Sequence, residues 1–325
     1  LIVNSINSLN MRINIAVYDE AHNIALKKND RKNATTSILH DKDDSAFMNN
    51  FLNVDKRLFM TATAKHFDIK VKQNDEEYDV ELAYSMDNKK FFGEISHEYS
   101  MREAIEEDVI ADYKIVAIQI EENFIKEYFN NAVIEEEHIE IVKSIAIVKA
   151  MEKYSINKAI IFNKNIEYSK IFTENVKKHH RELIAEHIDG RMGIEQRNNI
   201  LTDFSNRDKF VLSNSKLLSE GVDIPAVDMV AFMSTTKSLR DIVQRVGRAQ
   251  RIPKSHRDNN MRKVGYIFVP FVDDEVKTTY QTEFTKNQDA KLLYYIVNSL
   301  KNADKQLADV MEQKISSLSD EEYSV

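Results

Sequence analysis

Two short stretches of this sequence carry side chains that could act on a phosphate ester. The first is Asp19-Glu20-Ala21-His22, and the second runs from Val243 to Arg251 and reads VQRVGRAQR. One carboxylate can hold the hydration shell of Mg²⁺, and a second can take a proton from an attacking water. Arginines can meet the charge that spreads over a phosphoryl group in its transition state. Together the two stretches predict ATP hydrolysis.

The elements around the acidic stretch must place it at a ligand site. Ile13 to Tyr18 is an apolar run that ends at Asp19, which predicts a buried parallel strand. The acidic residues then stand at the carboxyl end of a strand, where open α/β sheets bind their ligands. Without that strand, an Asp-Glu pair would be typical of a solvated helix start.

The second stretch is predicted to be helical. Arg248 and Arg251 are three residues apart, so on a continuous helical turn they point the same way. Arg245, taken alone, is typical of the solvated face of a basic helix. Upstream of it, helical and strand patterns alternate, which predicts a parallel α/β domain. The strands are expected at 57–60, 114–120, 158–162, 187–188, 210–212, 229–232 and 264–270, and the helices at 101–109, 135–153, 194–204 and 288–316.

Four blocks, in chain order, resemble the motifs of superfamily 2 helicases and translocases. They are Asp19 to His22 (motif II), Thr61 to Ala64 (motif III), Ser219 to Pro225 (motif V) and Gln244 to Arg251 (motif VI). Further segments are most similar to the restriction-enzyme group, which includes the type III enzymes and the helicase part of single-polypeptide restriction-modification enzymes. These segments are Ser85-Met86-Asp87, Phe92-Gly93-Glu94, Met101 to Ile105 and Ser238 to Gln244.

The resemblance implies an α/β fold with two RecA-like parallel-sheet domains, the first one truncated, and a C-terminal helical extension. The expected bounds are 1–110 for the partial first domain, 111–275 for the second and 276–325 for the extension. Asp19 would hold Mg²⁺ through water and Glu20 would be the base, while Arg248 and Arg251 would be arginine fingers and Gln244 would sense the γ-phosphate. The nucleotide contacts would come from Asp19, His22, Gly221 and Asp223.

The resemblance also implies contacts to nucleic acid and a coupling element. Thr61 and Thr63 would couple the acidic tetrad to the nucleic-acid side, although a plain turn is the alternative. The expected contacts to the nucleic-acid backbone are Ser5, Ser8, Asn163, Lys164, Arg191, Asn214 and Ser215. For Ser5 and Ser8, a helix cap explains the residues equally well.

The phosphate-cradling loop of these helicases has no counterpart in the sequence. Nowhere does Gly-Lys-Ser or Gly-Lys-Thr occur, and the whole chain has six glycines. Since the chain starts at Leu1-Ile2-Val3 as if inside a strand, we interpret it as a fragment whose phosphate loop lies upstream. We expect these 325 residues alone to hydrolyse ATP slowly or not at all.

Composition narrows the class of protein further. With 325 residues and a net charge of −8, the chain has room for two globular domains, and a basic run from Lys237 to Lys263 predicts a local basic face despite the acidic total. It has no cysteine, which fits a reducing compartment such as the cytoplasm, and no apolar run long enough to span a membrane. His179-His180 is interpreted as the polar end of a helix rather than a metal site.

The resemblance therefore implies the ATP- and Mg²⁺-dependent motor core of a helicase or translocase that acts on double-stranded DNA. Two alternatives stay open: an RNA helicase, and a non-catalytic nucleic-acid-binding remnant without a phosphate loop. Nuclease or methyltransferase modules accompany such motors in similar restriction enzymes, and no residue in this sequence belongs to one.

Overall fold

The computed structural model describes residues 12–21, 54–61, 65–71, 78–86, 89–215, 224, 226–234, 239–259, 261–273, 292–293, 296–297 and 300. The chain forms two compact units. The first comprises Leu1–Glu98 with Lys237–Arg240, and the second comprises Tyr99–Thr236 with Asp241–Val325.

The first unit contains a parallel strand pair, as the sequence predicted for its first strand. β1 (Ile13–Tyr18) pairs in parallel with β2 (Val54–Phe59), so that Tyr18 stands beside Phe59. A short helix, α4 (Lys89–Phe92), adds Phe92 to the aromatic contact that these two rings make. β3 (Lys65–Val71) and β4 (Tyr78–Ser85) form a separate antiparallel pair.

The prediction that β1 is buried is wrong for one of its faces. Ile15 and Val17 are 57% and 54% exposed, and Leu58 and Met60 on the neighbouring strand are also exposed. Alternate side chains of a strand point to opposite faces. Within the described part of this unit, the aromatic contact of Tyr18, Phe59 and Phe92 covers the opposite face only.

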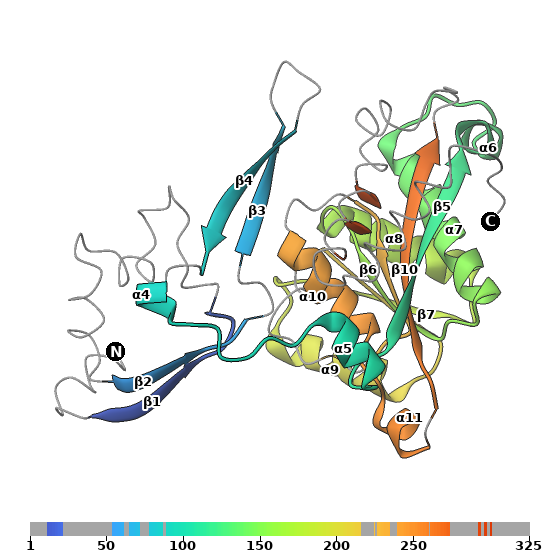
Figure 1. Ribbon diagram of the computed structural model, residues 1–325. Helices are drawn as coiled ribbons and strands as arrows, with labels where there is room; N and C mark the ends of the chain where they lie inside the picture. The colour runs from blue at the N-terminus through green and yellow to red at the C-terminus, as the bar shows by residue number, and fades with distance from the viewer. Residues whose placement is uncertain are drawn as a thin grey trace, which may run out of the picture. The chain divides into compact units, whose positions relative to one another are not determined.

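The second unit is built on a six-stranded sheet, visible in Figure 1, in which all the recorded pairings are parallel. The strand order is β5-β10-β9-β6-β8-β7. The strands are β5 (Asp112–Glu121), β6 (Lys158–Phe162), β7 (Ile184–Ile188), β8 (Phe210–Asn214), β9 (Met229–Phe232) and β10 (Val264–Asp273). This confirms the predicted parallel α/β class, and β5 and β7 are the two edge strands of the sheet.

Helices lie on both faces of this sheet, so its central strands are apolar at nearly every position. The helices between residues 99 and 273 are α5 (Met101–Glu106), α6 (Glu122–Tyr128), α7 (Glu136–Lys153), α8 (Ile166–His179), α9 (Ile194–Asn206), α10 (Leu239–Ala249) and α11 (Lys254–Asp258). Residues of α7 and α8, such as Ile147 and Phe172, share a buried cluster with alternate residues of the strands, such as Ile161. On the opposite face, Phe204 of α9 packs edge-on against Phe210.

Residues 99–110 belong with the second unit. The N–H of Ala111 donates to the carbonyl of Gln250 at 2.8 Å, and Arg257 donates to the carbonyl of Val109 at 3.0 Å. α5 is closed at its start by a capping box between Ser100 and Glu103. The contacts thus place the boundary between the two units after residue 98, whereas the sequence suggested a boundary after residue 110. The function of each part stays a prediction.

Beyond β10, five described residues are helical, at 292–293, 296–297 and 300. Leu292, Ile296 and Leu300 are fully buried at a spacing of four residues, as one stripe of a helix requires. The rest of the predicted helix 288–316 lies outside the described residues. Within the described parts of the chain, no helix has the length and apolarity needed to cross a membrane.

Candidate functional site

The turn after β1 brings the motif II residues beside motif III. The N–H of Met60 donates to the carbonyl of Tyr18, and the N–H of Ala21 donates to the carbonyl of Met60, both at 2.9 Å. Asp19 and Glu20 are therefore held next to Met60 and Thr61 at the carboxyl ends of two adjacent parallel strands. This is the position at which α/β sheets gather ligand-binding groups.

Glu20 has an unusual backbone conformation. Its φ is +48°, in the left-handed region that non-glycine residues seldom adopt. The turn is fastened locally, since the N–H of Glu20 donates to Oδ1 of Asp19 at 2.9 Å. Asp19 is exposed and Glu20 half-buried. Five other described non-glycine residues, all in turns or bends, share this region, so the conformation marks the turn and the role of Glu20 stays a prediction.

In the second unit, the carboxyl ends of three neighbouring strands carry the predicted nucleic-acid contacts. Asn163 and Lys164 follow β6, Arg191 lies three residues beyond β7, and Asn214 and Ser215 end and follow β8. Because β6, β8 and β7 are adjacent and parallel, their carboxyl ends share one edge of the sheet. The sequence could not supply this strand order, which is what brings these residues to one edge.

A buried chain of hydrogen bonds ties these strand ends together. Nδ2 of Asn163 donates to Oγ of Ser213 at 2.9 Å, and that hydroxyl lies 2.8 Å from Oγ of Ser169. The Ser169 hydroxyl is 2.6 Å from Nδ1 of His187, whose Nε2 is 2.9 Å from Oδ2 of Asp189. All five side chains are buried. Polar groups in such a network fix one arrangement of the strands, because leaving any of them unpaired would cost free energy.

The hydrogen-bond network ends at the carboxylate of Asp189. Burial raises the pKa of Asp189, but the hydrogen bonds from His187 and from the N–H of Arg191 outweigh burial, so the pKa lies below its usual value. The N–H of Arg191 donates to Oδ1 of Asp189 at 2.7 Å. Asp189 thereby fixes the turn that presents the exposed Arg191.

The predicted nucleic-acid contacts fall into two groups by exposure. Lys164 and Arg191 are exposed and Ser215 is half-buried, so their side chains can reach a ligand. Asn163 and Asn214 are buried, and Nδ2 of Asn214 donates to the carbonyl of Ile161 at 3.1 Å. The structure therefore places these two amides where they hold the strand ends.

Arg245 departs from the interpretation as a solvated basic residue. It is 7% exposed, and its guanidinium lies over the ring of Phe162, 4.5 Å from the centroid, with the Phe232 ring at 5.9 Å. Burial lowers its pKa, and Asp241 opposes that effect. The interpretation failed because Arg245 lies on the stripe of α10 that also buries Ile242 and Ala249. Its stacking on two rings holds α10 against β6 and β9.

Arg248 and Arg251 do not share a helical turn, which corrects the prediction from their spacing. α10 ends at Ala249, and Arg251 lies beyond it. Arg248 is 8% exposed, whereas Arg251 is exposed and its Nη1 donates to the carbonyl of Ile224 at 2.6 Å. Gln244, on the same helix as Arg248, is half-buried. Arg251 is thus fastened to the backbone of the motif V segment.

The end of α10 is held by several independent contacts. The ammonium group of Lys263 donates to the carbonyls of Val227, Ala249 and Arg251, at 2.6, 2.5 and 2.7 Å. Burial lowers the pKa of Lys263 to about 8, with Asp228 acting in the opposite direction. Gln250 adds its side chain, which donates to the carbonyl of Ala111 at 3.3 Å. These contacts hold the chain where it leaves the helix, before Arg251, and Pro253 also disfavours a longer helix.

A pair of glycine substitutions tests how tightly the end of α10 is packed. A methyl group at Gly265 of β10 would meet the carbonyl oxygen of Ala249 at 2.7 Å, whereas one at Gly247 would meet nothing within 4 Å. We expect Gly265→Ala to lower the free energy of unfolding by ~1–3 kcal/mol through overpacking. Gly247→Ala should raise it by up to about 1 kcal/mol through helix propensity. Chemical denaturation measures both, and equal effects of the two variants would contradict the packing.

Among its described residues, the predicted basic face between Lys237 and Lys263 has fewer exposed cations than the sequence suggested. Arg245 and Arg248 are buried, and the ammonium group of Lys263 donates its hydrogen bonds to backbone carbonyls. The exposed cations in the described part of this run are Arg251, Lys254, Arg257 and Arg262. The prediction counted too many cations, because Arg245 and Arg248 of α10 are buried.

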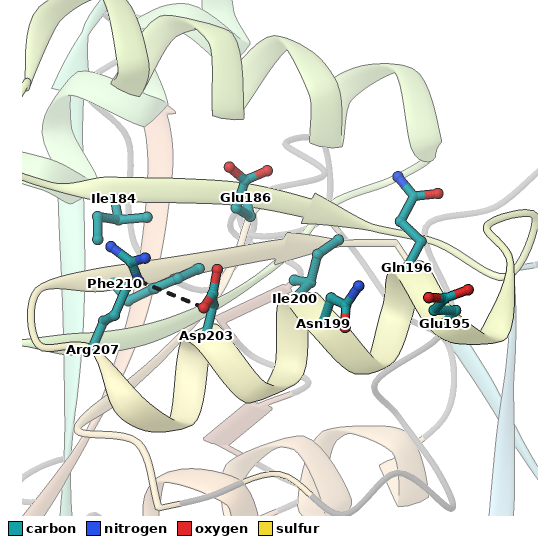
Figure 2. Close-up of a pocket in the computed structure, with 9 residues that line it drawn as sticks. All are labelled: Ile184, Glu186, Glu195, Gln196, Asn199, Ile200, Asp203, Arg207 and Phe210. Atoms are coloured by element: carbon teal, nitrogen blue, oxygen red, sulfur yellow. Dashed lines mark ion pairs between the residues drawn. The ribbon is translucent and has the colours of Figure 1, made fainter.

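Residues of edge strand β7 and helix α9 line a hollow of about 660 Å³. Figure 2 shows how the lining side chains lie. Its lining is mixed, with apolar Ile184, Ile200 and Phe210 beside Glu186, Glu195 and the ion pair of Asp203 with Arg207 at 3.6 Å. None of the residues expected to do chemistry lines it, so the strand ends and not this hollow define the candidate site.

Six of the predicted site residues lie outside the described residues: Ser5, Ser8, His22, Thr63, Gly221 and Asp223. Their roles stay predictions. The interpretation of His179-His180 as the polar end of a helix is confirmed, because His179 is the last residue of α8 and His180 is its C-cap. No group of three or more histidine, aspartate or glutamate side chains in the described ranges could hold a metal ion.

Comparison with known proteins agrees with this architecture. Residues 137–253 match the model of the helicase conserved C-terminal domain. A protein of African swine fever virus named "Probable helicase" is 29% identical over 206 residues, which is 62% of this chain and 22% of that protein. The structure of the ATP-dependent Type ISP restriction-modification enzyme LlaBIII bound to DNA superposes with a TM-score of 0.73 and 26% identity, covering 94% of this chain and 21% of that one.

The six-stranded parallel sheet with its covering helices is thus a RecA-like helicase domain. Residues 137–253 thus form a helicase C-terminal domain, and the chain is similar to superfamily 2 helicases, with an affinity to the restriction-modification enzymes, as the order of its motifs indicated. It spans about a fifth of the length of the viral relative and of LlaBIII.

Sequence reasoning missed several residues that shape the site. Arg245 could have been found, since the helical period that buries Ile242 and Val246 also turns residue 245 inward. Lys263 and the network of Ser169, His187 and Ser213 gave no sequence signal, because their partners are far away in the chain.

Proposed function

We propose that the protein containing this chain is an ATP-dependent motor that acts on double-stranded DNA. Glu20 of the first unit is the base that activates water, and Arg248 and Arg251 of the second unit are the arginine fingers. Lys164, Arg191 and Ser215 contact the nucleic-acid backbone at the carboxyl edge of the second sheet. The observation that carries the proposal is the likeness over 94% of the chain to LlaBIII, which is ATP-dependent and bound to DNA.

The donor set at the β1 turn fits Mg²⁺, which proteins usually hold through one or two carboxylates together with water and substrate phosphates. Asp19 offers an exposed carboxylate there, with Oδ1 already oriented by the N–H of Glu20. When bound, the ion would neutralise charge on the phosphates. The two residues have different roles. Asp19 positions the hydrated ion, and Glu20 receives the proton of the attacking water.

The nucleic-acid side of the proposal rests on exposed groups beside a rigid edge. Lysine and arginine supply the charge that a phosphate backbone requires, and a motor needs few such contacts, because it must release each phosphate in turn. The buried network beneath Lys164 and Arg191 would keep the two contacts at a fixed separation.

Stimulation of ATP hydrolysis by different polymers tests this function. On the native polypeptide that carries these residues, we expect duplex DNA to increase turnover more than single-stranded RNA of the same length does. Stronger stimulation by RNA would favour the RNA helicase instead. Nucleic-acid binding without any hydrolysis would favour a non-catalytic binding module. The assay should report salt concentration, since phosphate contacts weaken as salt rises.

A further inference from the structure

Lys164, a proposed nucleic-acid contact, already forms an ion pair with a carboxylate of its own chain. The side chain of Glu136, in the first turn of α7, forms an ion pair with the ammonium group of Lys164. Both side chains are more than half exposed, at 57% and 56%. Glu136 and Lys164 are 28 residues apart and come together only because α7 begins near the carboxyl end of β6.

Glu136 has a second donor, the hydroxyl of Tyr168. The hydrogen bonds from Lys164 and from Tyr168 lower the pKa of Glu136, and the bond to Glu136 raises the pKa of Tyr168 to about 12. The ammonium group of Lys164 also lies 5.7 Å from the centre of the Tyr168 ring. Tyr168 is itself held, because its N–H donates to Oδ1 of Asn165, the N-cap of α8, at 2.9 Å. One ammonium and one hydroxyl thus converge on a single carboxylate.

A carboxylate and a phosphate compete for the same donors, since both are anions that accept charge-assisted hydrogen bonds. We propose that Glu136 is an internal competitor of the nucleic-acid phosphate for Lys164 and Tyr168, and that it lowers affinity at this contact. This rests on the proposed function, in which Lys164 touches the backbone. An exposed ion pair contributes little stability, so a phosphate can displace the carboxylate at small cost.

The physical consequence suits a motor. A phosphate contact that must first displace an internal anion is weaker and is released more readily than the same lysine unpaired. Glu136 would then set how tightly Lys164 binds the nucleic-acid backbone. Arg191 is held differently, because its backbone N–H donates to Oδ1 of Asp189 and this bond does not involve its guanidinium. The competition by Glu136 therefore affects Lys164 and not Arg191.

Glu136→Gln on the full 325-residue chain tests this by fluorescence anisotropy with labelled duplex DNA. We expect affinity to rise about two- to fivefold, the range that an exposed ion pair supports. The slope of log affinity against log salt should steepen by up to about 0.9, since one more phosphate is neutralised. Glu186→Gln is the matched control, because Glu186 also pairs with an exposed lysine, Lys177, at 2.9 Å, and the variant changes net charge equally. Thermal melts confirm that each variant folds.

Lys164→Gln and the double variant separate the possible outcomes. Lys164→Gln should weaken binding, and adding Glu136→Gln to it should restore nothing, since the competing partner is gone. A gain from Glu136→Gln that equals that of Glu186→Gln, or one that persists without Lys164, overturns the competition while leaving the proposed function intact. If the unaltered chain binds neither DNA nor RNA, the nucleic-acid contact and the competition fail together.

Discussion

Glu20→Gln should abolish ATP hydrolysis while leaving nucleic-acid binding intact. Glutamine keeps the size of the side chain but cannot take a proton from water, and removing a general base costs ~10²–10⁴-fold in rate. The substitution should not change the backbone. Glu20 has φ +48°, and hydrogen bonds with Asp19 and Met60 hold the turn, so glutamine should occupy the same position. The measurement is steady-state ATP turnover of the native polypeptide, together with its affinity for duplex DNA.

The matched control for this prediction is Glu98→Gln. Glu98 is an exposed carboxylate of the same unit, so its loss changes net charge equally without touching the β1 turn. We expect turnover in this variant to stay near that of the unaltered protein. If Glu20→Gln retains turnover comparable to the control, Glu20 is not the base, and another group must activate the water.

Arg248→Gln should reduce the turnover number by ~10³–10⁵-fold, the range measured for arginine fingers in phosphoryl transfer. A finger acts on charge that develops in the transition state, so the turnover number should fall more than the KM for ATP changes. The side chain is held on α10 by the buried stripe of the helix and by the stacking of Arg245 on Phe162.

Because Arg248 is only 8% exposed, a neutral replacement could disturb folding, and a second variant is needed. Arg248→Lys keeps the charge but lacks the planar fork, so it should recover part of the lost rate. Arg262→Gln is the control, since Arg262 is exposed between α11 and β10. Equal turnover in Arg248→Gln and Arg262→Gln would show that Arg248 does not act on the nucleotide.

Much of this protein is determined by local sequence. The strand before Asp19, the parallel α/β class, the boundaries of β6 and β9, and the close of α8 at His179 all followed from patterns of a few residues. Such patterns report which side chains must be buried and where a helix can end, and both are local properties of the chain. The order of the motifs in the same way indicated the helicase family.

What only the tertiary structure decided is which groups meet. The strand order places Asn163, Arg191 and Ser215 on one edge, although the sequence separates them by up to 52 positions, the difference between 163 and 215. Packing on the sheet turned Arg245 onto two phenyl rings, and Lys263 and Gln250 bind the backbone where the chain leaves α10. These outcomes depend on partners distant in the chain, because burial and hydrogen bonding are satisfied in space and leave no periodic trace in the sequence.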